Sequence, residues 1–255
     1  MEILAATCTD IGITKETNQD SFCLKIAQTP FGNVTLAVIC DGMGGLSQGE
    51  VASASVVNAF SEWFEMELPI QLAKKDWSDI QYRWDRMIKE QNQRIAEYGR
   101  NMNIHLGTTW TALLLIDSEF LLIGHVGDSR VYRIHHELEI MTEDQTVVGL
   151  EMRRGRMTLE QARRDPRRNV LLQCIGASKL VQPQFIQGTP KSGDVYMLCS
   201  DGFRHMITDH EIFQAFSPGV LLDEATMEMK AKELVELNKQ RQETDNITVL
   251  LVKVL

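Results

Sequence analysis

The sequence predicts an α+β fold in which antiparallel strands are layered against helices, and three observations carry this prediction. Runs of apolar and β-branched residues of strand length recur along the chain and end in turn residues. Longer segments with apolar residues at helical spacing lie between the strand groups and before the last strand. Links between neighbouring strands are short, as at Gly127–Arg130, which favours antiparallel pairing.

The predicted strands share a high content of β-branched and apolar residues, and turn residues follow most of them. They are Ser21–Ala27, Val34–Cys40, Thr108–Ile116, Glu119–Val126, Val131–Ile134, Val195–Cys199 and Ile247–Val254.

The predicted helices are fewer and longer. Gln48–Met66 and Asp79–Met102 repeat apolar residues with a period near 3.6, as a helix with one buried face requires. Asp223–Lys239 is the third candidate.

Composition limits the class of protein. The 255 residues are 44% hydrophobic, which is enough for a sizeable core, and no repeat or Pro/Gly/Ser-rich linker divides them, so we expect one domain over residues 1–255. The net charge of −9 argues against a broad nucleic-acid surface. The five cysteines include no CxxC pair, which indicates free thiols in a reducing compartment.

The location is predicted from what the sequence does not contain. Residues 1–10 lack a basic region followed by a long apolar run, so we expect no signal peptide. No apolar stretch approaches the roughly 20 residues that cross a bilayer. The expectation is a cytoplasmic protein, a monomer, that binds neither membrane nor nucleic acid.

The informative feature is where the aspartates fall relative to the strands. Asp41 directly follows one apolar run, and Asp201 follows another after a single serine. Asp20 and Asp245 lie just before strands begin, and Asp128 lies between two strands. Because antiparallel neighbours bring one strand's end beside the next strand's start, all five carboxylates could gather at one edge of the sheets.

Five clustered carboxylates repel one another unless protons or cations compensate. Oxygen-only ligation suits Mg²⁺ or Mn²⁺, whereas zinc would usually recruit His or Cys. Each acid also has a plain structural interpretation. Asp41-Gly42 and Asp201-Gly202 could be ordinary turns, Gly127–Arg130 a simple hairpin, and Asp245-Asn246 a helix-to-strand turn.

The glycine-rich stretch Asp41-Gly42-Met43-Gly44-Gly45 precedes a predicted helix. It could cradle phosphate at the helix N-terminus, or it could be a tight turn with backbone close to a ligand. It lacks the GK[ST] ending of a nucleotide P-loop. In the tight-turn interpretation the Gly42 carbonyl is free to bind a metal.

In their order, these residues resemble the motifs of the metal-dependent PP2C-type (PPM) protein serine/threonine phosphatases, in their compact bacterial form. The resemblance covers nearly the whole chain. The matching segments are Thr9–Gly12, Asn18–Asp20, Asp41–Gly45, Gly107–Thr109, Gly127–Arg130, Met141–Gln145, Asn169–Leu171 with Gly176, Ser200–Gly202 and Asp245-Asn246.

The resemblance implies a four-layer αββα sandwich of two antiparallel sheets flanked by helices. It implies Mn²⁺ or Mg²⁺ as cofactor, two ions in a core site and a third beside them, and a cation-activated water that attacks phosphorus. Its metal residues would be Asp41, which bridges two ions, the Gly42 carbonyl, Asp201, Asp245, Asp128 with Asp201 at the third ion, and Asp20, which would bind a metal or its waters.

Two further features concern the substrate. Lys15 stands where the family usually has a phosphate-gripping arginine, so it is either a catalytic, substrate-binding residue or a solvated surface charge. Seven arginines crowd the segment at about 147–169, which the resemblance identifies as a mobile flap. Arg163 and Arg164 are the candidates for substrate binding, and the alternative is a solvated basic helix face.

The resulting prediction is an active phosphatase for phosphorylated proteins that opposes a bacterial serine/threonine kinase. One alternative is a pseudophosphatase that binds phosphoproteins without turnover, which only Lys15 favours. Another is a different metal-dependent phosphoesterase, such as a nuclease, which the acidic charge and the absence of base-stacking motifs disfavour.

Overall fold

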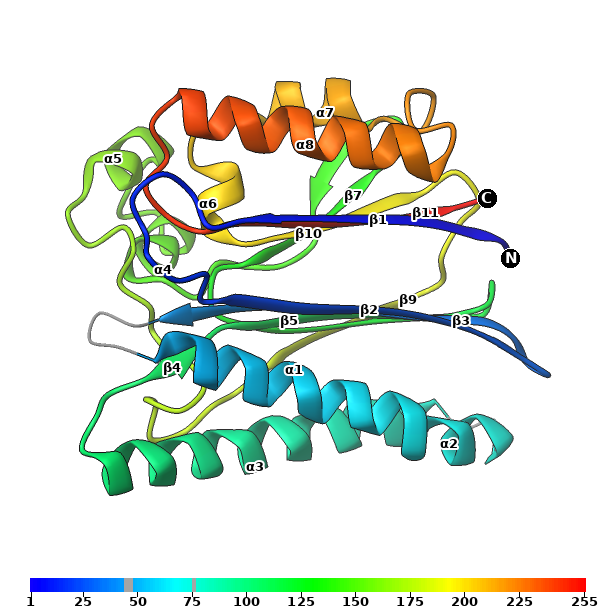
Figure 1. The fold of residues 1–255 in the computed structure, drawn as a ribbon, viewed down its shortest axis with the longest axis horizontal. Helices are drawn as coiled ribbons and strands as arrows, with labels where there is room; N and C mark the ends of the chain where they lie inside the picture. Colours follow the sequence, from blue (N-terminus) through cyan, green and yellow to red (C-terminus); the bar gives the residue numbers. More distant parts are fainter. Residues whose placement is uncertain (44–47, 75–76) are drawn as a thin grey trace.

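The computed structural model describes residues 1–43, 48–74 and 77–255. Two antiparallel sheets lie face to face, with α7 and α8 outside one sheet and α1, α2 and α3 outside the other (Figure 1). The αββα arrangement expected from the sequence is therefore confirmed.

The first sheet has five strands and carries the chain's first and last strands side by side. In spatial order they are β1 (Ile3–Asp10), β11 (Ile247–Val254), β10 (Val195–Cys199), β7 (Arg130–Ile134) and β8 (Leu138–Ile140).

The second sheet has six strands. In spatial order they are β2 (Asp20–Thr29), β3 (Gly32–Met43), β5 (Trp110–Ile116), β6 (Phe120–Val126) and β9 (Gln184–Gly188), with the short β4 (Gly107–Thr108) paired to β3.

The helices form the two outer layers and one end of the molecule. The outer helices are α1 (Gly49–Met66), α2 (Leu68–Lys74), α3 (Ser78–Met102), α7 (Asp209–Phe216) and α8 (Glu224–Gln240). At the end of the molecule opposite the two chain termini lie α4 (Val147–Arg153), α5 (Leu159–Arg164) and α6 (Asp201–Arg204) (Figure 1).

Successive side chains of the central strands point to opposite faces of the sheets, and together they fill three apolar layers. In β10, Met197 faces α7 and α8 while Leu198 faces the other sheet. In β3, Val38 faces α1 and α3 while Ile39 faces the first sheet. Because both faces of these strands are buried, their sequences are continuous apolar runs.

The seven predicted strands and three predicted helices are all present, with ends that shift by at most a few residues. One prediction about their connection is wrong. Gly127–Arg130 is not a hairpin, because β6 pairs with β5 and β9 in one sheet while β7 pairs with β10 and β8 in the other. The short link carries the chain from one sheet to the other instead.

No helix within the described ranges is both long and apolar enough to cross a membrane. All five cysteines are free thiols, and Cys40, Cys174 and Cys199 are buried.

Candidate metal centre

Strand register brings Asp20 and Asp41 together in the second sheet. Asp20 is the first residue of β2, and Asp41 lies directly opposite it near the end of β3. Opposed residues in an antiparallel pair have side chains about 5 Å apart. The β2–β3 pair therefore places two carboxylates side by side at one end of the strands of this sheet.

Three more acids lie next to strands of the first sheet, at the same end of the two sheets. Asp201 begins α6 just after β10, and Asp245 lies two residues before β11, which is the antiparallel neighbour of β10. Asp128 lies in the β6–β7 link, and β7 pairs with β10 on its other side. Ser200 Oγ donates a 2.9 Å hydrogen bond to Asp20 Oδ2 and so joins the two sets of acids.

Threonine and serine hydroxyls tie these segments together. Thr109 Oγ1 accepts a 2.9 Å hydrogen bond from the Asp41 amide and lies 2.9 Å from Ser129 Oγ. Thr108 Oγ1 donates to the Asp41 carbonyl. These contacts give a physical role to the Gly107–Thr109 and Gly127–Arg130 motifs, which fix the backbone at Asp41 relative to Asp128.

The pKa values reflect how tightly the acids are packed. Burial raises the pKa of Asp41 well above its usual value, and the charges of Asp20, Asp201, Asp128 and Asp245 raise it further. Burial also raises the pKa of Asp20 to about 7, although hydrogen bonds from Thr248 and Ser200 lower it in part. The cluster is thus short of positive charge.

The oxygens of the cluster fit hard divalent cations. Asp20 Oδ1 and Asp201 Oδ1 are buried without a hydrogen-bond partner, which is costly for a carboxylate unless something charged approaches it. Mg²⁺ and Mn²⁺ prefer such oxygens, and Mg²⁺ usually takes one or two carboxylates and completes its shell with water. Among the described residues, no group of three or more His, Cys, Asp or Glu side chains is arranged to hold a metal ion by side chains alone.

Two glycines allow the backbone segments of the centre to approach closely. A Cβ on Gly202 would lie 2.2 Å from the Asn246 carbonyl oxygen, and one on Gly42 would lie 2.4 Å from the Gly49 carbonyl oxygen. Only glycine fits at such distances. Gly44 and Gly45, the rest of the possible phosphate cradle, lie outside the described residues.

Glu243 shapes the loop that presents Asp245. Its Oε1 accepts hydrogen bonds of 2.8 and 2.9 Å from the amides of Thr244 and Asp245, and its Oε2 lies 3.4 Å from His205 Nδ1. The other ring nitrogen of His205 lies 3.5 Å from Asp201 Oδ2. The sequence analysis missed both residues, although the i,i+4 spacing of Asp201 and His205 on a helix was a usable signal.

Arg204 is the third residue that the sequence analysis missed. Its Nη2 donates to the Asp128 carbonyl at 3.0 Å and lies 3.9 Å from Asp128 Oδ2 and 3.5 Å from Asp144 Oδ2. Asp144 also receives two 2.7 Å hydrogen bonds from Arg130. Burial would raise the pKa of Asp144, but the charges of Arg204 and Arg130 hold it at about 2.

Lys15 lies at the cluster and is half-exposed. Its Nζ is 2.6 Å from Asp245 Oδ1. Burial alone would lower the pKa of Lys15, but the hydrogen bond and charge of Asp245 and the charges of Asp41 and Asp201 raise it. The structure thus brings Lys15 to the acids, and its role in binding phosphate stays a prediction.

The seven arginines of residues 153–168 are all exposed, and most are already paired. Arg164 pairs with Glu160 at 2.9 Å, Arg156 with Glu151 at 2.7 Å and Arg167 with Asp165 at 2.9 Å. Arg163 has no acidic partner among the residues that the structure describes. Of the two arginines predicted to bind substrate, only Arg163 is unpaired.

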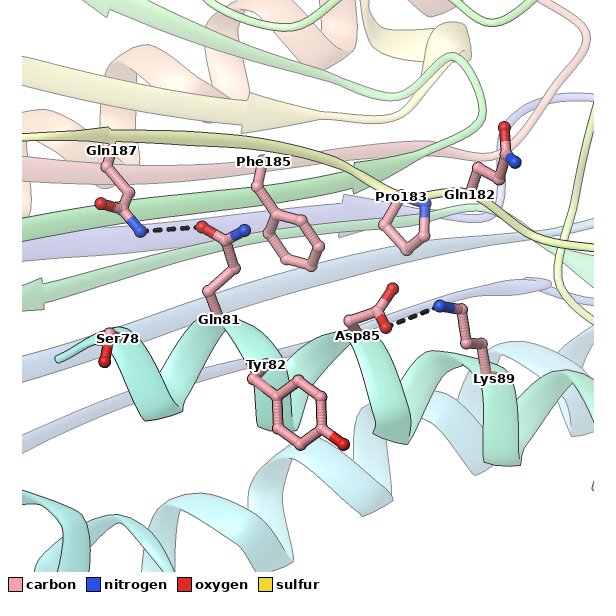
Figure 2. Close-up of a pocket in the computed structure, with 9 residues that line it drawn as sticks. All are labelled: Ser78, Gln81, Tyr82, Asp85, Lys89, Gln182, Pro183, Phe185 and Gln187. Carbon is pink, nitrogen blue, oxygen red and sulfur yellow. Dashed lines mark hydrogen bonds and ion pairs between the residues drawn. The ribbon is translucent and has the colours of Figure 1, made fainter.

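A groove of about 500 Å³ lies away from the aspartates, between α3 and the edge strand β9 (Figure 2). Its polar side chains bond one another, Asp85 with Lys89 at 2.6 Å and Gln187 with Gln81 at 2.7 Å. None of the five aspartates lines it. The carboxylate cluster and this groove are therefore separate features of the surface.

Comparison with known proteins agrees with the geometry. The family model described as protein phosphatase 2C matches residues 13–237. A serine/threonine phosphatase, stp, of Listeria monocytogenes is 31% identical over 224 residues, which cover 87% of this chain and 85% of the relative.

Two solved structures have the same fold. The serine/threonine phosphatase of S. agalactiae has a TM-score of 0.85 and 30% identity, and the match covers all of both chains. The catalytic domain of the phosphatase PstP, solved with 2 manganese ions, has a TM-score of 0.80 and 29% identity, and the match covers 99% of this chain and 98% of that one.

Proposed function

Because this chain belongs to the protein phosphatase 2C family and is a metal-dependent protein serine/threonine phosphatase, we propose that Asp41, Asp201 and Asp245, with the Gly42 carbonyl, hold its two catalytic cations. The observation that supports this assignment most strongly is the convergence of acids from both sheets, with a buried oxygen of Asp201 left without a partner. Asp20 is joined to the segment that bears Asp201 by its hydrogen bond from Ser200. Mn²⁺ or Mg²⁺ suits the oxygen ligands.

Two cations at such a centre lower the pKa of a bound water and neutralise charge on the phosphoryl oxygens. The chain's own residues supply position. Asp41 is held by its backbone bonds to Thr108 and Thr109, and Asp245 by the amide bonds of its loop to Glu243. A rigid set of ligands is what holds a nucleophile in line with phosphorus.

Lys15 is our candidate for binding the substrate phosphate. Its ammonium is close to Asp245 and half-exposed, so it can turn toward an incoming dianion. A lysine offers a point charge and not the bidentate fork of arginine. We therefore expect Lys15→Arg to lower the KM for phosphopeptide and Lys15→Ala to raise it, and a KM that is the same in all three proteins would remove Lys15 from the site.

The substrates that we propose are phosphorylated proteins, including those of a cognate serine/threonine kinase. The segment at about 147–169, which includes α4 and α5, would act as the flap beside the substrate, with Arg163 free to meet an acidic or phosphorylated chain. A single domain, a monomeric state and a cytoplasmic location remain parts of this proposal, and the five free thiols support the last.

A third cation at Asp128 and Asp201 is the finer part of the cofactor prediction. The contacts of Arg204 with Asp128 oppose it. A pseudophosphatase is not favoured, because every predicted metal aspartate lies in the cluster and the relatives are named as phosphatases.

The proposed function is tested by phosphate release from three substrates: a phosphothreonine peptide, an aryl phosphate and single-stranded DNA. We expect Mn²⁺-dependent release from the first two, none in EDTA, and no cleavage of DNA. The variant Asp209→Asn, which changes an exposed acid on α7, should keep full activity. Peptide turnover that persists in EDTA, or cleavage of DNA alone, would contradict the proposal.

A further inference from the structure

A permanent positive charge lies beside Asp128. Arg204 Nη2 is 3.0 Å from the Asp128 carbonyl oxygen and 3.9 Å from its Oδ2. An arginine side chain stays protonated in proteins at any ordinary pH. Asp128 therefore has a cation in place before any metal is added.

Arg204 is held in that position by its own element and by a second pair of charges. It lies three residues after Asp201 in α6, one helical turn along, and its side chain is only 14% exposed. Its Nη2 is also 3.5 Å from Asp144 Oδ2, and Asp144 is gripped by the two nitrogens of Arg130. Two arginines and two aspartates therefore lie together at this point.

A further cation at Asp128 would meet Arg204 there. The nearest Arg204 nitrogen is 3.9 Å from Asp128 Oδ2, and the Arg204 side chain is mostly buried. A divalent ion at Asp128 would lie beside the Arg204 guanidinium. Like charges at such separations repel strongly where water is scarce.

We propose that the Arg204 guanidinium takes the place of a third divalent cation at Asp128, so that this chain binds two catalytic ions and not three. This inference rests on the proposed function, which assigns the two core ions to Asp41, Asp201 and Asp245. Arg204 thereby becomes a positioning residue that fixes Asp128 and the β6–β7 link. It also separates this chain from the arrangement that the sequence resemblance implies.

Counting bound Mn²⁺ by equilibrium dialysis, with metal measured by mass spectrometry, tests the proposal without an activity assay. We expect two Mn²⁺ per natural chain and still two in Asp128→Asn, because Asp128 holds no ion. Arg204→Met keeps much of the side-chain volume but removes the charge, and we expect it to bind a third ion. The double variant Arg204→Met with Asp128→Asn should return to two.

Arg133→Met, at an arginine of β7 that pairs with Glu139, is the control and should bind two. If Arg204→Met fails to fold, the comparison of the natural chain with Asp128→Asn still decides. Three ions in the natural chain, falling to two in Asp128→Asn, would overturn this inference but leave the core site intact. A folded Arg204→Met that stays at two would overturn it as well, and fewer than two ions in the natural chain would overturn the core site with it.

Discussion

The hydroxyl of Ser200 donates a 2.9 Å hydrogen bond to Asp20, which lies 180 residues earlier in the chain and in the other sheet. The same oxygen accepts a hydrogen bond from the Thr248 amide at 3.1 Å. Ser200 is fully buried. One small side chain therefore couples the strand that delivers Asp201 to the strand that delivers Asp20.

Ser200→Ala should weaken this coupling. The change leaves the Thr248 amide and Asp20 each short of a partner, which typically costs about 1–3 kcal/mol. We expect a lower unfolding free energy in urea and a higher Mn²⁺ concentration for half-maximal activity. Ser118→Ala, at an exposed turn, is the control, and an equal effect of the two changes would contradict the role of Ser200.

The raised pKa of Asp20 predicts an unusual pH dependence of the unfolding free energy in the metal-free protein. The folded pKa is about 7 and the ordinary value is 3.8, so between these pH values the native state holds a proton that the unfolded state does not. The contribution of Asp20 to the unfolding free energy therefore falls as pH rises from about 4 to about 7.

In the Asp20→Asn variant, the side chain at this position is an amide and cannot ionise. In EDTA, its unfolding free energy should gain on that of the natural chain across the same pH range. Comparing the two proteins cancels the effect of other groups, such as His125, whose pKa burial lowers to about 4. Saturating Mn²⁺ should favour the natural chain again, because a nearby cation stabilises the carboxylate. Parallel curves for the two proteins would contradict the burial of a protonated Asp20.

Gly202→Ala should damage activity more than stability. The added Cβ would lie 2.2 Å from the Asn246 carbonyl oxygen and 3.3 Å from Asp245 Cβ, so the segments bearing Asp201 and Asp245 must move apart. Overpacking of this kind costs about 1–3 kcal/mol. Gly219→Ala is the matched control, because nothing lies within 4 Å of its added Cβ. Full activity in a folded Gly202→Ala protein would show that the close approach is not required.

The α4–α5 segment gives a prediction about substrate recognition. Arg163→Glu should raise the KM for a phosphopeptide roughly 10-fold, the effect of about 1.4 kcal/mol, and change the KM for an aryl phosphate little. Arg164→Glu should have a smaller effect, because Arg164 is already paired with Glu160. Equal changes for both substrates would refute recognition by Arg163.

Strands with two buried faces were the easiest part of the fold to predict. Val195–Cys199 and Ile247–Val254 were predicted with the bounds that the structure has, since a continuous apolar run leaves little doubt about where the strand ends. Three of the four edge strands, Ile3–Asp10, Leu138–Ile140 and Gln184–Gly188, were missed because their patterns are mixed, whereas the fourth, Asp20–Thr29, was predicted as Ser21–Ala27.

Short helices were missed although two of them carry a local signal. Thr158 with Gln161 and Thr208 with Glu211 form capping boxes, and this spacing is visible in the sequence. The aspartates of the centre were predicted because strand ends locate them. Arg204 and Glu243 were not, since their contacts depend on how α6 and the loop before β11 pack together.

The central claim is that carboxylates from both sheets form one cation-dependent hydrolytic centre. The most direct test is phosphate release from a phosphothreonine peptide as a function of Mn²⁺ concentration, in the natural chain and in Asp41→Asn, with circular dichroism to check folding. We expect saturable activation of the natural chain by Mn²⁺, and a rate of phosphate release that is lower by roughly 10³-fold or more in the folded variant at saturating Mn²⁺. Activity in Asp41→Asn that matches the natural chain would contradict the claim.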